Sequence, residues 1–206
     1  MVGKFISIEG VEGAGKSTQV SFIQDYLTSL GKTVVVTREP GGTELSEKIR
    51  NLLLEPSPNS MDNDTELLLM FASRAEHVSK VINPALHRGE WVLCDRFLDA
   101  TYAYQGAGRG IQRQRIQQIA DWTLKGLTPD LTLLFDLPVE LGLERVLERK
   151  GGMDRFEQEK INFFKKIRKS YLKSAKAEPN RIKIVDASLS RTKIQKQLTQ
   201  LIKPLI

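Results

Sequence analysis

Short apolar segments alternate along the chain with longer segments in which apolar residues recur every three or four positions. The first short segment, Lys4 to Glu9, precedes a stretch from Lys16 to about Leu30 that has the period of an amphipathic helix. Further strand-like segments cover residues 33–37, 91–94, 131–137 and 182–185. Segment 33–37, three valines between two threonines, predicts a fully buried strand. This alternation predicts an α/β fold with a five-stranded parallel sheet and helices on both of its faces.

The segments between the strands have helical periodicity. They cover about 43–53, 65–87, 100–104, 111–124, 139–149 and 164–175, and a closing helix begins near residue 190. The stretch 55–64, rich in Pro, Ser, Asn and Asp, interrupts the chain without separating domains. Lys150-Gly151-Gly152 predicts a flexible break. We therefore expect a single domain over residues 1–206, with a small lid at about 149–157.

Charge and reactive residues narrow the class of protein. The chain has 31 Lys and Arg against 25 Asp and Glu residues, a net charge of +6, which favours anionic partners. The basic residues are spread or interleaved with glutamates, so small phosphorylated ligands are favoured over nucleic acid. The single cysteine, Cys94, excludes a disulfide framework. No apolar segment reaches the ~18 residues of a membrane span, and no signal sequence precedes the first strand, which predicts a cytoplasmic protein without a membrane partner.

A glycine-rich loop follows the first predicted strand. Residues Gly10 to Ser17 read GVEGAGKS and match the pattern G-x-x-x-x-G-K-[ST] at the junction of a strand and a helix. Glycines let backbone N–H groups surround a phosphate, and the start of the helix adds partial positive charge. Lys16 is expected to reach the β- and γ-phosphates of a nucleotide, and the Ser17 hydroxyl to ligate Mg²⁺. The predicted nucleotide-binding residues are Gly10, Val11, Glu12, Gly13, Ala14, Gly15, Lys16, Ser17 and Thr18.

A carboxylate ends the strand 91–94. Asp95 follows Trp91-Val92-Leu93-Cys94, and by itself it would more often be a cap for the next helix. In a chain that also contains the glycine-rich loop, Asp95 is better interpreted as a second ligand of Mg²⁺. Arg96 would then bring positive charge to a second phosphate group.

Three classes of nucleotide protein share such a loop. A switch GTPase requires D-x-x-G and N-K-x-D motifs, and the chain contains neither. A motor or transporter ATPase usually has additional domains, for which 206 residues leave no room. A small kinase is the most economical hypothesis. Kinases for various nucleoside monophosphates (dTMP, dUMP, dCMP or AMP) remain open at this point, as does a non-catalytic nucleotide-binding protein.

Five further motifs resemble one family. They are TREPGGT at 37–43, FASR at 71–74, DRF at 95–97, AYQG at 103–106 and DRFE at 154–157. Together and in this order they resemble the motifs of bacterial thymidylate (dTMP) kinases. The resemblance implies transfer of the γ-phosphoryl group of ATP to dTMP with Mg²⁺, a step of dTTP biosynthesis from both de novo and salvage sources, and a homodimer.

The resemblance also implies an acceptor site. Phe71 would stack on thymine, although packing in the core is the alternative, and Arg74 would donate to a base carbonyl. Tyr104 would crowd the 2′ position of the sugar, and Arg38 and Arg96 would clamp the acceptor phosphate. The predicted substrate-binding residues are Glu12, Arg38, Glu39, Phe71, Arg74, Arg96, Thr101, Tyr104 and Gln105.

The acceptor is itself a phosphate with a second pKa of about 6, so transfer requires no general base. Lys16, Arg96, Arg149 and Arg155 are the predicted catalytic residues, the last two as arginines of the lid. Gly13 stands where some family members carry an arginine, which is consistent with arginines supplied by the lid. Ala100 stands where many relatives have a serine. His77, His87 and Cys94 are expected to be structural.

Overall fold

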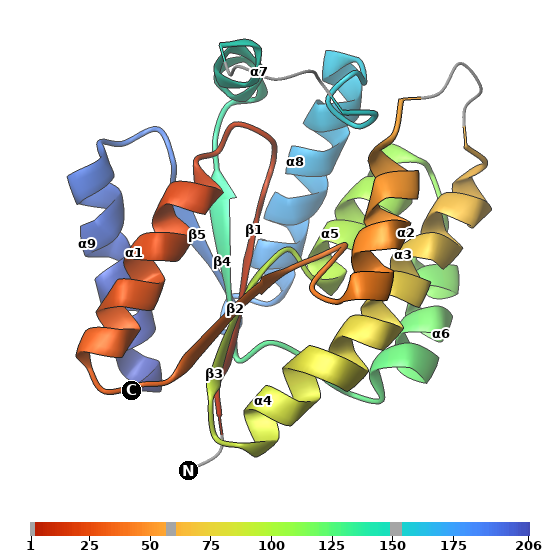
Figure 1. Cartoon of the computed structure of the whole chain (residues 1–206). Coiled ribbons are helices and arrows are strands. Elements are labelled where there is room, and N and C mark those ends of the chain that lie inside the picture. The colour runs from red at the N-terminus through yellow and green to blue at the C-terminus, as the bar shows by residue number, and fades with distance from the viewer. Residues whose placement is uncertain (1–2, 57–60, 149–153) are drawn as a thin grey trace.

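A five-stranded parallel sheet forms the centre of the molecule (Figure 1). The computed structural model describes residues 3–56, 61–148 and 154–206. The strands are β1 (Phe5–Gly10), β2 (Val34–Arg38), β3 (Trp91–Asp95), β4 (Leu131–Asp136) and β5 (Ile182–Asp186), in the order β2-β3-β1-β4-β5. All four pairs of neighbouring strands are parallel, which confirms the predicted sheet.

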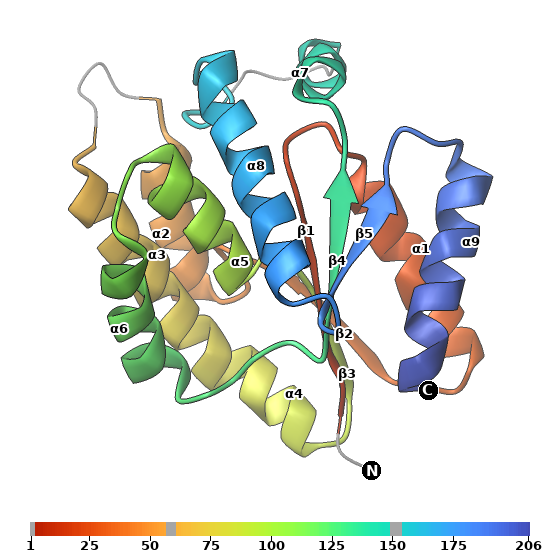
Figure 2. The ribbon, with the colours of Figure 1, turned by 180° about the vertical axis from the view of Figure 1, so that it is seen from behind.

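Helices cover both faces of this sheet, as Figures 1 and 2 show from opposite sides. Helices α1 (Lys16–Ser29) and α9 (Arg191–Ile202) cover one face, and a short 3₁₀ turn, η3 (Lys203–Leu205), ends the chain. The other face carries α2 (Glu44–Leu54), α3 (Asn63–His77), η1 (Val78–Ile82), α4 (Asn83–His87), α5 (Leu98–Thr101), η2 (Tyr102–Gly108), α6 (Arg113–Leu124) and α8 (Ile161–Ala177). Helix α7 (Val139–Leu147) lies beyond the carboxyl end of the sheet.

Strand β2 differs from its prediction. It occupies an edge of the sheet, and the Val36 residue is 40% exposed to solvent. Three consecutive valines are compatible with an edge strand and with a central strand. Which of the two forms depends on whether a second strand, far away in the sequence, pairs with the free side.

The predicted helix 65–87 consists of three consecutive segments. It begins two residues earlier than expected, at Asn63, because the Asp62 carboxylate accepts from the backbone N–H groups of Asp64 and Thr65. The π turns of η1 separate α3 from α4, and Pro84 follows them directly. Proline has no N–H group with which to continue the α-helical hydrogen bonds, so the helix changes form there.

A second π segment follows β3. The predicted helix 100–104 is α5 continued by the seven residues of η2. Since a π turn holds more residues than an α turn, this segment turns both Tyr104 and Gln105 towards the carboxyl edge of the sheet. The region that positions functional side chains is therefore this edge, where the loops after β1, β2 and β3 meet.

Candidate active site

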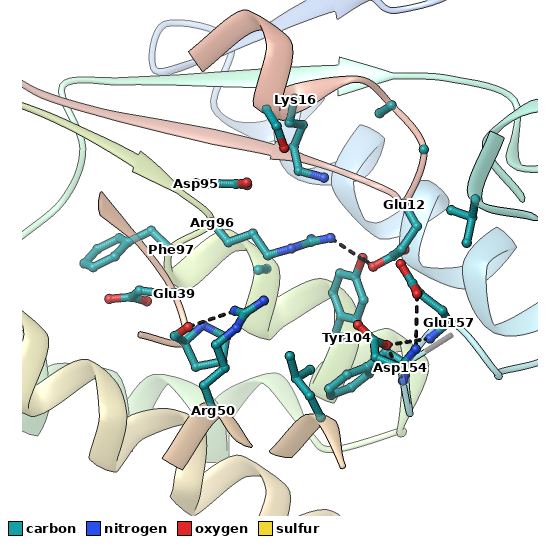
Figure 3. A pocket seen from close by; sticks show the side chains of 18 of the residues that line it. Glu12, Lys16, Glu39, Arg50, Asp95, Arg96, Phe97, Tyr104, Asp154 and Glu157 are labelled. Carbon is teal, nitrogen blue, oxygen red and sulfur yellow. Dashed lines mark hydrogen bonds and ion pairs between the residues drawn. The ribbon is translucent and has the colours of Figure 1, made fainter. Parts of the chain in front are cut away.

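A cavity of about 670 Å³ opens at the carboxyl edge of the sheet (Figure 3). Ligands bind at this edge in open α/β sheets. Fourteen predicted site residues line it: Glu12, Gly13, Ala14, Gly15, Lys16, Ser17, Thr18, Glu39, Arg74, Asp95, Arg96, Thr101, Tyr104 and Gln105. Among the described residues, the lining also includes five residues of the TREPGGT, DRF and DRFE motifs that were not named as site residues: Pro40, Phe97, Asp154, Phe156 and Glu157. Further lining residues that lie outside these motifs are Arg50, Leu54, Met70, Arg145 and Val146.

The glycine-rich loop forms one end of the cavity. Gly13 and Gly15 adopt left-handed backbone angles, with φ of 70° and 76°, so the chain turns sharply before α1 begins. The Lys16 ammonium curls back and donates to the carbonyl oxygens of Gly10 and Val11, at 3.1 and 3.2 Å. Burial, with a further contribution from the nearby Arg96 guanidinium, lowers the pKa of Lys16 to about 8. A buried cation in a cradle of backbone N–H groups is a site for an anion.

Asp95 lies at the end of β3 close to this loop (Figure 3). Its Oδ1 atom is buried and has no hydrogen-bond partner among the residues that the structure describes. A buried carboxylate oxygen without a partner suits a hard cation, which binds few protein oxygens when phosphates and water complete its shell. Asp95 and the Ser17 hydroxyl therefore fit Mg²⁺. No cluster of three or more His, Cys, Asp or Glu side chains that could hold a metal is found within residues 3–56, 61–148 and 154–206.

Arg96 is held in a strained backbone conformation next to Asp95. Its φ of +71° is uncommon for a residue with a side chain and turns the guanidinium back towards the glycine-rich loop. There Nη2 donates to Glu12 Oε1 at 2.9 Å, and Nη1 donates to the Gly10 carbonyl at 3.1 Å. The guanidinium also lies over the Tyr104 ring, 4.8 Å from its centroid. The loop, the strand end and η2 thus fix one cation between the two ends of the cavity.

Glu12 receives two donors on one oxygen. Tyr104 donates its hydroxyl to Glu12 Oε1 at 2.6 Å, the same atom that accepts from Arg96. Within the described parts of the chain, Glu12 Oε2 is buried and has no hydrogen-bond partner. Tyr104 is in turn packed edge-on against the rings of Phe156, Phe163 and Tyr171. A carboxylate oxygen is thereby available to a hydroxyl group inside the cavity.

Arg74 is buried in the opposite wall. Its guanidinium donates through Nε to Glu39 Oε2 at 2.6 Å, through Nη1 to Thr101 Oγ1 at 3.0 Å, and through Nη2 to the Phe97 carbonyl at 3.1 Å. Arginine has five N–H groups, so two remain for a ligand. These predicted substrate residues (Glu39, Arg74 and Thr101) come together as one rigid group.

Phe71 requires a correction. The structure buries its ring in the hydrophobic core with Leu67 and Phe97, and Met70 lines the cavity instead. Met70 and Arg74 are four residues apart and share one face of α3, whereas Phe71 is rotated by about a quarter turn into the core. The sequence contained this signal in the i, i+4 spacing, but an apolar run from Leu67 to Ala72 conceals which residue faces inward.

Arg38 also lies elsewhere than expected. Its side chain is mostly exposed and forms an ion pair with Glu47 at 2.9 Å, outside the cavity. Arg50 of α2 lines the cavity instead and donates to the Pro40 carbonyl at 2.9 Å. Burial, and then the neighbouring Arg38, lowers the pKa of Arg50. Arg50 is thus the cation that the structure offers together with Arg96 on this side.

The predicted lid arginines give a mixed result. Arg149 and the Lys150-Gly151-Gly152 break lie outside the described residues. Arg155 does not line the cavity, because its Nη2 pairs with the buried Glu66 carboxylate at 2.7 Å and its Nε donates to the Leu53 carbonyl at 2.8 Å. Arg145 of α7, which the sequence analysis missed, donates to the Gly13 carbonyl at 3.3 Å and lines the cavity.

Glu66 and Glu9 are two buried carboxylates that sequence reasoning did not identify. Glu66 accepts from Gln105 Nε2 at 2.8 Å and also pairs with Arg109 and Arg155. Glu9 is the only charged residue of the buried strand β1, which was the available signal. It accepts from the Phe97 N–H and the Tyr171 hydroxyl, both at 2.7 Å. Burial, with a contribution from Asp99, raises the pKa of Glu9 to about 8.

The remaining predicted structural residues are buried or pair locally. Cys94 is fully buried and donates its thiol to the Arg96 carbonyl at 3.0 Å. Burial, with Glu39 next, raises the pKa of this thiol well above its usual range. His87 is exposed and bonds to the Asn83 carbonyl. Within the described part of the chain, no helix is long and apolar enough to cross a membrane.

The chain resembles known proteins over nearly its whole length. The family model described as thymidylate kinase matches residues 8–198. A thymidylate kinase of Pseudomonas syringae pv. tomato is 55% identical over 206 residues, which is 100% of this chain and 98% of that protein. A thymidylate kinase of Ruthia magnifica is 54% identical over 196 residues, 95% of either chain. The crystal structure of thymidylate kinase from Ehrlichia chaffeensis is 33% identical, covers 100% of both chains and has a TM-score of 0.78.

Proposed function

Because the chain belongs to the thymidylate kinase family, we propose that its two substrates meet in the cavity at the carboxyl edge of the sheet. The enzyme transfers the γ-phosphoryl group of ATP to dTMP, which gives ADP and dTDP, and it uses Mg²⁺. The single observation that carries the proposal is that the Arg96 guanidinium lines the cavity, donates to Gly10 and Glu12 of the glycine-rich loop and lies over the Tyr104 ring of η2.

The donor phosphates bind at the glycine-rich loop. Lys16 leaves the Gly10 and Val11 carbonyls for the β- and γ-phosphates, and the anion favours its charged form despite the lowered pKa. Ser17 and Asp95 would hold Mg²⁺, which would supply positive charge to the donor phosphates. Arg145, at the Gly13 carbonyl, adds a cation on the α7 side of the loop.

The acceptor binds between Arg74 and Tyr104. The two remaining N–H donors of Arg74 meet the base carbonyls, and Met70 covers the base on the same face of α3. Glu12 Oε2 is available to the sugar 3′-hydroxyl, and Tyr104 closes the space beside the 2′ position. Arg96 and Arg50 then hold the acceptor phosphate, and Gln105 completes the acceptor wall.

Charge compensation and alignment accomplish the transfer. Both reacting groups are polyanions, so the protein has to hold them in line while cations offset the charge on the moving group. At neutral pH the acceptor phosphate, with its second pKa of about 6, is already an adequate nucleophile. Lys16 and Arg96 are the catalytic cations, and Arg149 remains a candidate lid arginine. Arg155 has a positioning role through Glu66.

A panel of acceptors tests this assignment. Arg96→Gln should lower kcat by roughly a thousandfold or more, because an arginine that offsets charge in phosphoryl transfer contributes on this order. Arg113→Gln is the matched control, since the Arg113 guanidinium lies over the Tyr102 ring and does not line the cavity. Each protein is assayed with ATP, Mg²⁺ and dTMP, dUMP, dCMP or AMP. Unchanged kcat in Arg96→Gln, or a better acceptor than dTMP in the wild type, would contradict the site assignment.

The same proposal includes a cytoplasmic homodimer. Helices α2, α3 and α6 lie together on one side of the sheet, and each exposes a large apolar side chain: Leu52, Leu68 and Trp122. Trp122 is 80% exposed, and burial of such side chains favours association. Light scattering after gel filtration should give twice the chain mass for the wild type and the chain mass for the Leu68→Lys/Trp122→Lys variant. Leu30→Lys, which changes an exposed leucine after α1, should remain dimeric.

A further inference from the structure

A chain of buried polar side chains runs from strand β2 to the acceptor wall. Thr37 Oγ1 lies 2.6 Å from His77 Nε2, and His77 Nδ1 lies 3.0 Å from Glu39 Oε1. The other oxygen of Glu39 accepts from Arg74 Nε at 2.6 Å. His77 is fully buried, and Glu39 and Arg74 are almost so. From the sequence, His77 is expected to be structural, and no step of the transfer uses it.

The hydrogen-bond partners in this series of side chains determine which atoms carry a proton. An ionised carboxylate only accepts, so His77 Nδ1 carries a proton and donates it to Glu39 Oε1. With one proton on the imidazole, Nε2 accepts from the Thr37 hydroxyl. Arg74 offsets the charge of the buried Glu39 carboxylate. Each group of the chain therefore has one orientation that satisfies its neighbours.

The loop after β2 closes over the histidine. Gly42 has φ of +89°, and a Cβ atom there would lie 2.5 Å from His77 Cδ2 and 2.6 Å from Thr37 Oγ1. The Gly41 N–H donates to Ser73 Oγ at 3.3 Å, which joins the same loop to α3. The imidazole thus occupies the space that a side chain at position 42 would need, so the loop can close over it only with a glycine there.

We propose that His77 is a positioning residue for the dTMP site: through Glu39 it fixes the direction in which Arg74 presents its free N–H groups. The inference rests on the proposed acceptor site. Both oxygens of Glu39 accept a hydrogen bond, which fixes the plane of its carboxylate group. The direction of the hydrogen bond from Arg74 Nε is therefore fixed as well. Without the histidine donor, Glu39 Oε1 loses its buried partner, and the carboxylate gains freedom to rotate and to carry the guanidinium with it.

Steady-state kinetics of matched variants test this role. His77→Phe fills the space without a donor, whereas His77→Asn keeps an N–H near the position of Nδ1. His77→Phe should raise KM for dTMP about tenfold, the effect of losing one buried hydrogen bond to a charged group. KM for ATP should stay within about twofold, and His77→Asn should restore KM for dTMP to within about threefold of the wild type. His87→Phe, at the other, exposed histidine, is the control and should match the wild type.

Three outcomes overturn the inference. One is a lower unfolding temperature of His77→Phe with KM for dTMP unchanged, and another is equal KM values for His77→Phe and His77→Asn. If His77→Phe does not fold, Thr37→Val, at the half-exposed β2, removes only the outer donor and should raise KM for dTMP about threefold. An unchanged KM for Thr37→Val is the third. Arg74→Lys separates the two proposals: if it leaves KM for dTMP unchanged, the acceptor site itself is wrong.

Discussion

Gly13 of the phosphate loop and Gly142 of α7 are in backbone contact. A Cβ atom on Gly13 would lie 2.0 Å from the Gly142 carbonyl oxygen, and a Cβ atom on Gly142 would lie 2.5 Å from the Glu12 carbonyl oxygen. Helix α7 therefore packs on the loop too closely for any side chain at position 13. This contact also holds Arg145 beside the loop, where its guanidinium donates to the Gly13 carbonyl. An arginine of α7 therefore lies next to the position at which some family members carry an arginine in the loop.

Gly142→Ala tests this contact without strain in the helix, since alanine favours helices. The added methyl group has to displace the loop or α7, and we expect KM for ATP to rise roughly tenfold because overpacking costs on the order of 1–3 kcal/mol. KM for dTMP should change less. Glu144→Ala, at an exposed position of the same helix, is the control. A Gly142→Ala enzyme with wild-type KM for ATP would show that α7 does not constrain the loop.

Met70 and Phe71 should respond differently to truncation. Met70→Ala should raise KM for dTMP about fivefold, because it removes roughly 1 kcal/mol of apolar contact with the base. Phe71→Ala should lower the free energy of unfolding by about 3–5 kcal/mol, the usual cost of removing a buried aromatic ring. Kinetics and chemical denaturation of both variants provide the comparison. The reverse pattern would restore Phe71 as the residue that contacts thymine.

Arg155→Ala should affect stability, because it removes one of two arginines that pair with the fully buried Glu66. We expect the free energy of unfolding to fall by about 2 kcal/mol, less than for an isolated buried pair since Arg109 remains. Adding Glu66→Gln should recover part of this loss. Arg115→Ala, which breaks the exposed pair with Asp64, should cost less than about 1 kcal/mol. A stable Arg155→Ala protein with a strongly lowered kcat would instead make Arg155 catalytic.

Glu9 should give the stability a pH dependence. Its pKa is about 8 in the folded protein and near 4.5 in an unfolded chain, so the folded state binds more protons between these values. The free energy of unfolding should therefore decrease as the pH rises from about 5 to 8, by at most about 1.4 kcal/mol per pH unit. Glu9→Gln retains a hydrogen-bonding side chain but has no titration there, and its slope should be smaller. Equal slopes for the two proteins would contradict the assignment.

Local and contiguous features were predictable from the sequence. The glycine-rich loop carries its geometry within eight residues, and Asp95 follows directly from the end of an apolar strand. The features that were missed depend on partners far along the chain. Arg145 contacts Gly13, 132 residues away, and Arg155, which follows α7 in the chain, contacts Glu66 of α3. A single arginine has the same appearance in the sequence whether it faces a phosphate or a buried carboxylate.

Helix faces were a second limit. The spacing of Phe71 and Arg74 is compatible with one face, and so is that of Met70 and Arg74, since both i, i+3 and i, i+4 neighbours lie on one side of a helix. Only the packing of α3 on the sheet selects between them. The same holds for β2, because its three valines do not indicate whether the strand lies at the edge or in the middle of the sheet.

The two tryptophans of the chain occupy opposite environments: Trp91 is 5% exposed within β3, and Trp122 is 80% exposed on α6. In a single chain, Trp122 is therefore open to water and Trp91 is shielded from it. A soluble quencher such as iodide should reach Trp122 in the monomer and lose access to it when a second copy covers α6, so quenching can report on association separately from events in the sheet.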